Sequence, residues 1–201
     1  IILKVMHTIM HADKDLRSNY FGIVQTQIFD RFYRYIFRND EDKLFVGVKG
    51  TEMAVPLVDF ETKSKKTRDS IIIKLLHKAE NVAEELFDRV GIRFVTETRF
   101  DTLRVIRFLL EKNIVIPHNN KPSRAINTMI DLSRFKEAHQ RVIKMALRNN
   151  LSEDRFVAAM EREIQECNLQ GEGSDKNKFT SKSYQSIQFT CRQLIEYKNP
   201  F

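Results

Sequence analysis

Residues 87–95 (FDRVGIRFV) and the basic stretch that precedes them, residues 62–74 (TKSKKTRDSIIIK), determine the predicted fold. The first stretch predicts a short buried strand at 91–95, with the carboxylate of Asp88 just before it and Arg93 within it. The second predicts the end of a strand followed by the start of a helix, which places several cations at one junction. A carboxylate close to several cations can hold a metal ion and a phosphate. We therefore expect any chemistry of this chain to take place here.

Length and composition limit the class of protein. The chain has 201 residues, 42% hydrophobic and 30% charged, which predicts one globular domain with its own core. The sequence lacks an apolar run long enough for a transmembrane helix, so we expect no membrane partner. The formal net charge of +7 favours phosphate-bearing partners such as nucleotides or RNA. Cys167 and Cys191 lack metal-ligand spacing, so we expect free thiols and a cytoplasmic location.

The N-terminal part of the chain is predicted to be helical over residues 1–39, with a polar break at 39–43. Within it, residues 31–38 (RFYRYIFR) interleave arginines with aromatic side chains. This stretch fits either an RNA-binding surface or an amphipathic helix whose aromatic side chains pack inward, and we favour packing. Apolar side chains recur there at roughly helical spacing, at Leu16, Tyr20, Ile23, Ile28, Phe32 and Tyr35.

Strands and helices alternate in the middle of the chain, which predicts an α+β fold with a mixed β-sheet flanked by helices. One helix is expected to follow a cap at Thr67 or Asp69 and to extend to Phe87. A second is expected over 101–112, with Leu103, Ile106 and Leu110 on its inner side. The predicted strands are 44–48, 55–66, 91–95 and 114–116.

The C-terminal part predicts two further helices, at 131–149 and 152–168, and a final strand at 184–192. We interpret the chain as a single domain. Its predicted parts are an N-terminal helical segment (1–42), a sheet core (43–118 and 179–201) and a helical insertion (119–178).

Three groups of residues have the chemistry of a nucleotide site. Lys66, Ser70 and Lys74 span the junction of a strand and a helix, where ammonium groups and helix amides can cradle phosphates, although a solvated basic turn has the same pattern. Asp88 could hold Mg²⁺ on a triphosphate or could cap a turn. Tyr184 could stack on a base or could pack against the insertion.

Taken together, these motifs resemble the synthetase domain of the RelA/SpoT family, the enzymes of the stringent response that make the alarmone (p)ppGpp. The agreement in order and spacing covers roughly residues 55–117 and 179–192, apart from the helical insertion. The family pattern Arg-x-Lys, then Ser-Ile, then Lys is matched by Lys66, Ser70, Ile71 and Lys74. The pattern Asp-x-x-Gly-Ile-Arg is matched by Asp88, Gly91, Ile92 and Arg93. The pattern Tyr-Gln-Ser-Ile is matched by Tyr184, Gln185, Ser186 and Ile187.

The resemblance implies a nucleotidyltransferase-like fold and a pyrophosphokinase that moves pyrophosphate from ATP to the 3′-hydroxyl of GDP or GTP with Mg²⁺. It implies that Asp88 binds the metal and, with Lys74, is catalytic. It also implies that Tyr184 stacks on the acceptor guanine. The nucleotide-binding residues that it implies are Lys66, Ser70, Lys74, Arg93, Lys182, Tyr184 and Gln188.

The chain departs from the family pattern at several positions. Ser64 stands where the family has arginine, and Gln188 stands where it has histidine. The family's later Glu-x-Gln-Ile-Arg strand has no counterpart before Phe201, so either the protein continues or the site lacks a metal ligand and general base. Three alternatives stay open: pyrophosphate transfer to another acceptor such as the 3′ end of tRNA, a non-catalytic nucleotide- or RNA-binding module, and a helical interaction protein that docks a partner through 119–178.

Overall fold

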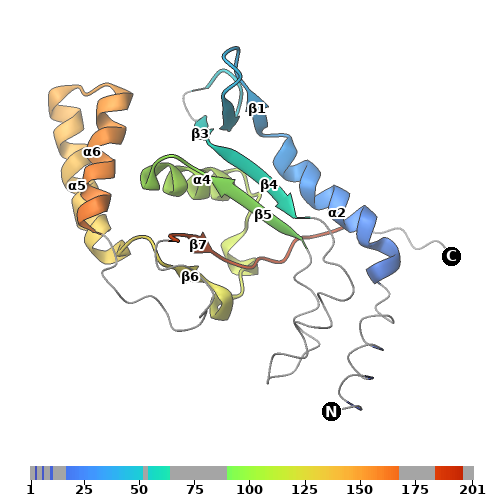
Figure 1. Ribbon diagram of the computed structural model, residues 1–201. Coiled ribbons are helices and arrows are strands. Elements are labelled where there is room, and N and C mark those ends of the chain that lie inside the picture. Colours follow the sequence, from blue (N-terminus) through green and yellow to red (C-terminus); the bar gives the residue numbers. More distant parts are fainter. Residues whose placement is uncertain are drawn as a thin grey trace.

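The protein has an α+β fold, and its described residues form helices and three small antiparallel sheets (Figure 1). The α+β prediction is confirmed. The single mixed sheet is not found in the part of the chain that the structure describes, because every strand pairing there is antiparallel. None of the described helices is long and apolar enough to cross a membrane. The computed structural model describes residues 17–51, 54–63, 90–167 and 184–196, together with Leu3, Met6 and Met10.

The helices are α2 (Arg17–Tyr33), α4 (Arg99–Glu111), α5 (Leu132–Asn149) and α6 (Glu153–Glu166), with short 3₁₀ turns at Pro117–Asn119 and Pro122–Arg124. One sheet has the order β1 (Ile36–Arg38), β2 (Leu44–Val46), β3 (Val55–Leu57). The other two pair β4 (Asp59–Lys63) with β5 (Gly91–Val95), and β6 (Ile126–Asn127) with β7 (Ile187–Gln188).

A β-hairpin, β1–β2, occupies the place where we expected the first helix to continue. Asn39 Oδ1 accepts hydrogen bonds from the N–H groups of Glu41 and Lys43 at 3.1 and 2.9 Å, and Asp42 has a φ of 61°. Such an Asn/Asp turn reverses the chain, and the run of aromatic and β-branched residues before it favours a strand over a helix. In residues 31–38, Phe32 is buried and Tyr35 packs edge-on against Phe108, which supports the packing interpretation.

Two strands replace the one that we predicted over residues 55–66. β3 pairs with β2, whereas β4 pairs with β5. The chain changes sheets at Val58, whose N–H donates to the carbonyl of Val95 at 2.8 Å while its side chain is 63% exposed. Pro56 fits because β3 lies at the edge of its sheet. The inward positions also shift here, from Val55 and Leu57 in β3 to Phe60 in β4, so an unbroken alternation over 55–66 does not hold.

Helix α4 lies between two hydrophobic cores, which makes the predicted inner face wrong. Val105 and Phe108 belong to a core with β2 and β3, whereas Phe100 belongs to a second core with α5 and α6. Of the three residues we placed inside, Leu103 is only partly buried and packs against the second core, and Leu110 is 37% exposed. Because the helix has apolar side chains on two sides, its sequence fits more than one buried face.

The predicted strand at 114–116 is also wrong. Ile114 and Val115 are buried, but their N–H groups both donate to the carbonyl of Leu109 at 2.9 and 3.1 Å, directly after α4. Asn113 makes the turn in the left-handed region, with a φ of 53°. A short apolar run therefore indicated burial here and not a strand.

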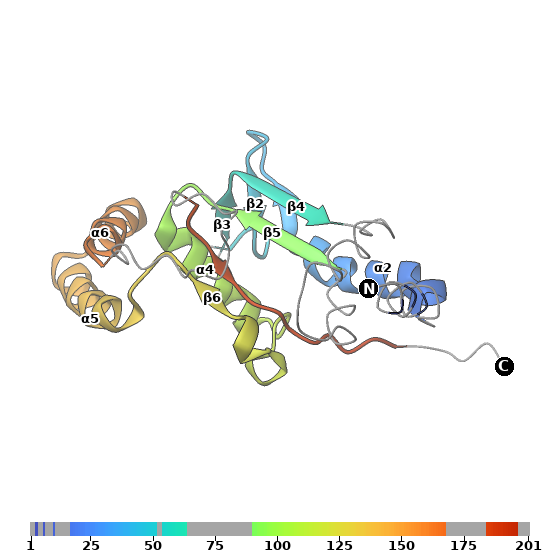
Figure 2. The ribbon, with the colours of Figure 1, turned by 60° about the horizontal axis from the view of Figure 1, so that its bottom comes forward.

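Helices α5 and α6 confirm the two predicted C-terminal helices and form a hairpin at one end of the molecule (Figures 1 and 2). Asp131 caps α5 by accepting hydrogen bonds from the N–H groups of Ser133 and Arg134. The segment 119–178 also contributes β6, which pairs with β7, so its described part is not purely helical. β7 is shorter than the strand predicted at 184–192. An isolated bridge between Asn120 and Cys191 continues its pairing.

Candidate functional site

The candidate site is centred on β4 and β5, which lie side by side in Figure 2. Their register pairs Phe60 with Phe94, and these rings contact each other at 5.1 Å and pack toward the first core. Neighbouring residues on a strand point to opposite faces, so the other face of the pair is polar and turned to solvent. We call this the β4–β5 polar face, and its side chains are Asp59, Glu61, Lys63 and Arg93.

Arg93 is the predicted site residue that the structure places most clearly. It lies in the middle of β5, opposite Glu61, and its Nη1 is 3.1 Å from Glu61 Oε2. The two side chains are 42% and 39% exposed. An ion pair with this exposure is weak in water, so an incoming phosphate could compete with Glu61 for the guanidinium.

Lys63 and Gly91 pair with each other at the other end of this face. A Cβ added to Gly91 would lie 3.4 Å from Lys63 Cβ, which is close to van der Waals contact. Lys63 is exposed and forms no ion pair within the part of the chain that the structure describes. Because these two residues are paired, the segment 64–89 leaves and rejoins the described fold at one strand end.

Several predicted site residues lie outside the described residues. They include the residues to which we assigned phosphate binding, metal binding and catalysis, so those roles stay predictions. The residues are Lys66, Ser70, Lys74, Asp88 and Lys182, and Ser64 lies outside as well.

Tyr184 and Gln188 belong to the segment that contains β7. The backbone of this segment is fixed to β6, because Thr128 N–H donates to the carbonyl of Ser186 and Ser186 N–H donates to Thr128 Oγ1, both at 3.0 Å. Tyr184 is 42% exposed, and Gln188 Nε2 donates to Ser186 Oγ at 2.8 Å. Among the described residues, neither Tyr184 nor Gln188 forms a hydrogen bond with Arg93.

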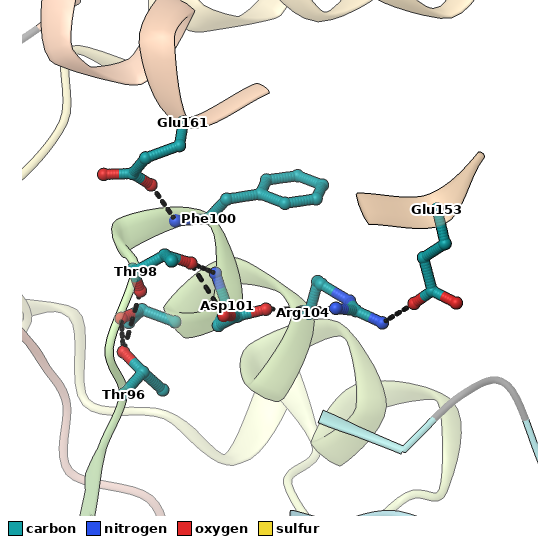
Figure 3. A network of polar contacts seen from close by, with 8 residues as sticks. Thr96, Thr98, Phe100, Asp101, Arg104, Glu153 and Glu161 are labelled. Carbon is teal, nitrogen blue, oxygen red and sulfur yellow. Dashed lines mark hydrogen bonds and ion pairs between the residues drawn. The ribbon is translucent and has the colours of Figure 1, made fainter. Parts of the chain in front are cut away.

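A polar network that sequence reasoning missed lies at the start of α4 (Figure 3). Thr98 Oγ1 accepts a hydrogen bond from Asp101 N–H at 3.0 Å and donates one to Asp101 Oδ2 at 2.7 Å. Arg104 then bridges Asp101 Oδ1, at 3.1 Å, and Glu153 Oε1, at 2.6 Å. Thr98 followed three residues later by Asp101 before an apolar run is a helix-capping pattern that could have predicted this feature.

This network joins two helices rather than forming an open site. Asp101 is only 3% exposed, and it is the one buried charged residue in the described part of the chain. Glu161 of α6 adds a second link, because its Oε2 accepts a hydrogen bond from Phe100 N–H at 3.0 Å. Every carboxylate of the network has a partner within the protein, so we interpret it as a structural connection between α4 and α6.

Metal ligands and thiols do not identify a second site in the described residues. No group of three His, Cys, Asp or Glu side chains that could hold a metal ion occurs within them. Asp59 and Glu61 offer oxygen donors of the kind Mg²⁺ prefers, but Glu61 is paired with Arg93. Cys167 and Cys191 are free thiols, as expected. Burial raises the pKa of the Cys167 thiol, which disfavours its reactive thiolate form.

Comparison with known proteins adds no family to these observations. No family model, no curated protein and no solved structure matches this chain.

Proposed function

We propose that this protein is a pyrophosphokinase that transfers the pyrophosphate of ATP to the 3′-hydroxyl of a nucleotide, as the RelA/SpoT synthetases do. The observation that carries the proposal is the pairing of β4 with β5. This pairing puts Arg93 on a solvent-facing surface and puts Lys63 opposite Gly91. The segment that starts and ends at that pair contains the basic motif and Asp88. The basic motif and Asp88 are thus joined in sequence to the strand end that carries Lys63 and Gly91.

The proposed reaction is an in-line displacement at the β-phosphorus of ATP. The acceptor's 3′-oxygen forms a bond to the β-phosphorus, and the bond between that phosphorus and the α–β bridging oxygen breaks. AMP leaves with the electron pair, and the 3′-hydroxyl proton passes to a base or to water. Negative charge grows on the phosphoryl and bridging oxygens, so fixed cations stabilise the transition state.

Each residue of the proposed site has a part in this scheme. Lys66, Ser70 and Lys74 are proposed to hold the ATP phosphates, and Arg93 to supply a further cation on the β4–β5 polar face. Asp88 is proposed to hold Mg²⁺, which neutralises phosphate charge when bound. The exposed ring of Tyr184 offers a surface on which the acceptor base can stack.

The test is a transfer assay with γ-labelled ATP, Mg²⁺ and separate acceptors: GDP, GTP and tRNA. We expect label to move to an acceptor with equal release of AMP, and we expect Asp88→Asn or removal of Mg²⁺ by chelation to stop it. Asp40→Asn is the matched control, because Asp40 is exposed and far in sequence from the motifs. If no acceptor gains label, or if Asp88→Asn behaves like Asp40→Asn, the proposed reaction is wrong.

A second candidate is a non-catalytic nucleotide-binding module of the same fold. It is favoured by Gln188, which stands where the family has histidine and is hydrogen-bonded to Ser186. This candidate predicts that calorimetry detects binding of ATP or GDP, while the transfer assay detects no movement of label to any acceptor. Nucleotide binding that is insensitive to Asp88→Asn would support it further.

A further inference from the structure

We infer that the outer face of α5 binds the phosphate backbone of RNA. Helix α5 carries the cations Arg134, Lys136, Arg141, Lys144 and Arg148, against the single carboxylate of Glu137. This excess of positive charge lies on a hairpin at one end of the molecule, away from the β4–β5 polar face (Figures 1 and 2).

Two of these cations lie close to α6. Arg141 Nη2 is 3.3 Å from Glu163 Oε2 of α6. Arg134 and Arg141 both lie close enough to Cys167, at the end of α6, to favour its thiolate. The ion pair between Arg141 and Glu163 therefore links α5 to α6.

The other three cations face solvent, and we call them the α5 basic face: Lys136, Lys144 and Arg148. All three are exposed, and none forms an ion pair within the described part of the chain. Spacings of eight and four residues place them within about a third of the helix circumference, about 12 and 6 Å apart along its axis. A row of this length can contact several phosphates of one nucleic-acid strand.

No carboxylate of α6 forms an ion pair with this face in the described part of the chain. Glu153 pairs with Arg104, Glu161 accepts a hydrogen bond from Phe100 N–H, and Glu163 pairs with Arg141. The other two, Asp154 and Glu166, form no ion pair among the described residues. The side of α5 that carries Ala138 and Val142 is buried in the hairpin and unavailable to a membrane, whereas Met145 and Leu147 of the same helix are 42% and 79% exposed. A helix that lies on a membrane would instead present its apolar side outward. Charge complementarity therefore favours a polyanion.

RNA is the polyanion we propose, because a ribonucleotide 3′-hydroxyl is the acceptor in the proposed reaction and an RNA chain ends in that group. The choice of RNA over DNA rests on the proposed function, whereas the position of the basic face does not. The two proposals fail separately, since RNA binding needs no ATP and transfer to GDP needs no RNA.

The test measures anisotropy of labelled, unfractionated tRNA over a range of salt concentrations. Replacing Lys136, Lys144 and Arg148 together by Gln should weaken binding at least tenfold. It should also lower the salt slope by about 2 to 3, since each lost phosphate contact removes about 0.7–0.9. The matched control replaces Lys43, Lys49 and Lys112 by Gln, which removes equal charge from exposed positions elsewhere and should change affinity less than twofold.

Three results would overturn the inference. The first is no tRNA binding by the unaltered protein, and the second is equal weakening by both triple variants, which would indicate net charge alone. The third is a preference for duplex DNA or for phosphatidylserine vesicles over tRNA. Lysine acetylation of the unaltered protein gives a check that needs no variant: bound tRNA should protect Lys136 and Lys144, and should leave Lys49 and Lys112 reactive.

Discussion

Two arginine–carboxylate pairs of this protein have opposite surroundings. Arg93 and Glu61 meet across two strands with side chains that are 42% and 39% exposed. Arg104 and Asp101 meet at the start of α4 with side chains that are 20% and 4% exposed. The distance between the paired atoms is 3.1 Å in both. Distance therefore does not separate the pairs, and exposure does.

The difference indicates which pair is available to a ligand. Exposed ion pairs contribute about 0–1 kcal/mol to stability, so the fold does not depend on keeping Arg93 beside Glu61. A buried carboxylate that loses its partner is left as an uncompensated charge, which costs several kcal/mol. We conclude that the first pair can be exchanged for contacts with a substrate, whereas the second fixes Arg104, which links α4 to Glu153 of α6.

The largest expected effect is on stability, from Arg104→Met. This change leaves the buried Asp101 carboxylate without its cation and should lower the free energy of unfolding by about 3 kcal/mol, measured with urea. Arg107→Met is the matched control. Arg107 is 78% exposed and pairs with Glu111 on the same helix, so its loss should cost less than about 1 kcal/mol. Equal losses of unfolding free energy in the two variants would show that burial of the carboxylate does not make its ion pair more important for stability.

Tyr184→Ala tests whether an exposed residue of the proposed site contributes to ligand binding and not to stability. Stacking on a base contributes about 1–3 kcal/mol, so we expect the KM for the acceptor nucleotide to rise about tenfold. The free energy of unfolding should hardly change, because the ring is 42% exposed. Tyr184→Phe keeps the stacking surface and should retain the original KM. A loss of stability without a change in KM would make Tyr184 a packing residue instead.

Thr98→Ala tests a smaller part of the buried network. The variant removes the hydroxyl that caps α4 through Asp101 N–H, and the free energy of unfolding should fall by about 1 kcal/mol. Thr98→Ser retains the hydroxyl and should recover most of this loss in the same urea titration. If the Thr98→Ser variant is as unstable as the Thr98→Ala variant, loss of the hydroxyl contacts is not the cause of the lower stability.

The smallest expected effect on stability is that of Glu61→Gln. Removing an exposed ion pair should change the free energy of unfolding by less than about 0.5 kcal/mol. The same change frees Arg93 from its protein partner, so we expect the KM for ATP to stay level or to fall a few-fold. A rise in KM would mean that Glu61 contributes to the substrate site and does not merely compete for Arg93.

Local patterns predicted the elements in which one signal dominates. The strand at 91–95 was predicted with the bounds it has, because an apolar run follows a glycine there. Both helices of the α5–α6 hairpin were also predicted, and the start of the second is marked by Ser152 with two acidic residues after it.

The errors arise where partners that are distant in sequence decide the structure. Val58 changes sheets because its N–H reaches Val95, and α4 buries two sides because a core lies on each. Arg93 was predicted as a site residue, but its pairing with Glu61 depends on the strand register. The role of Asp101 could have been recognised only in part, since its cap is local while its connection to α6 through Arg104 is not.

The most direct test of the central claim is the rate of label transfer from γ-labelled ATP by Arg93→Gln. If the β4–β5 polar face is where the reaction takes place, loss of this cation should slow transfer by about 100-fold, as loss of one fixed transition-state donor does elsewhere. The free energy of unfolding should stay within about 1 kcal/mol of the original, because the pair is exposed. A rate within twofold of that of the unaltered protein would contradict the account, as would the absence of transfer by the unaltered protein to every acceptor.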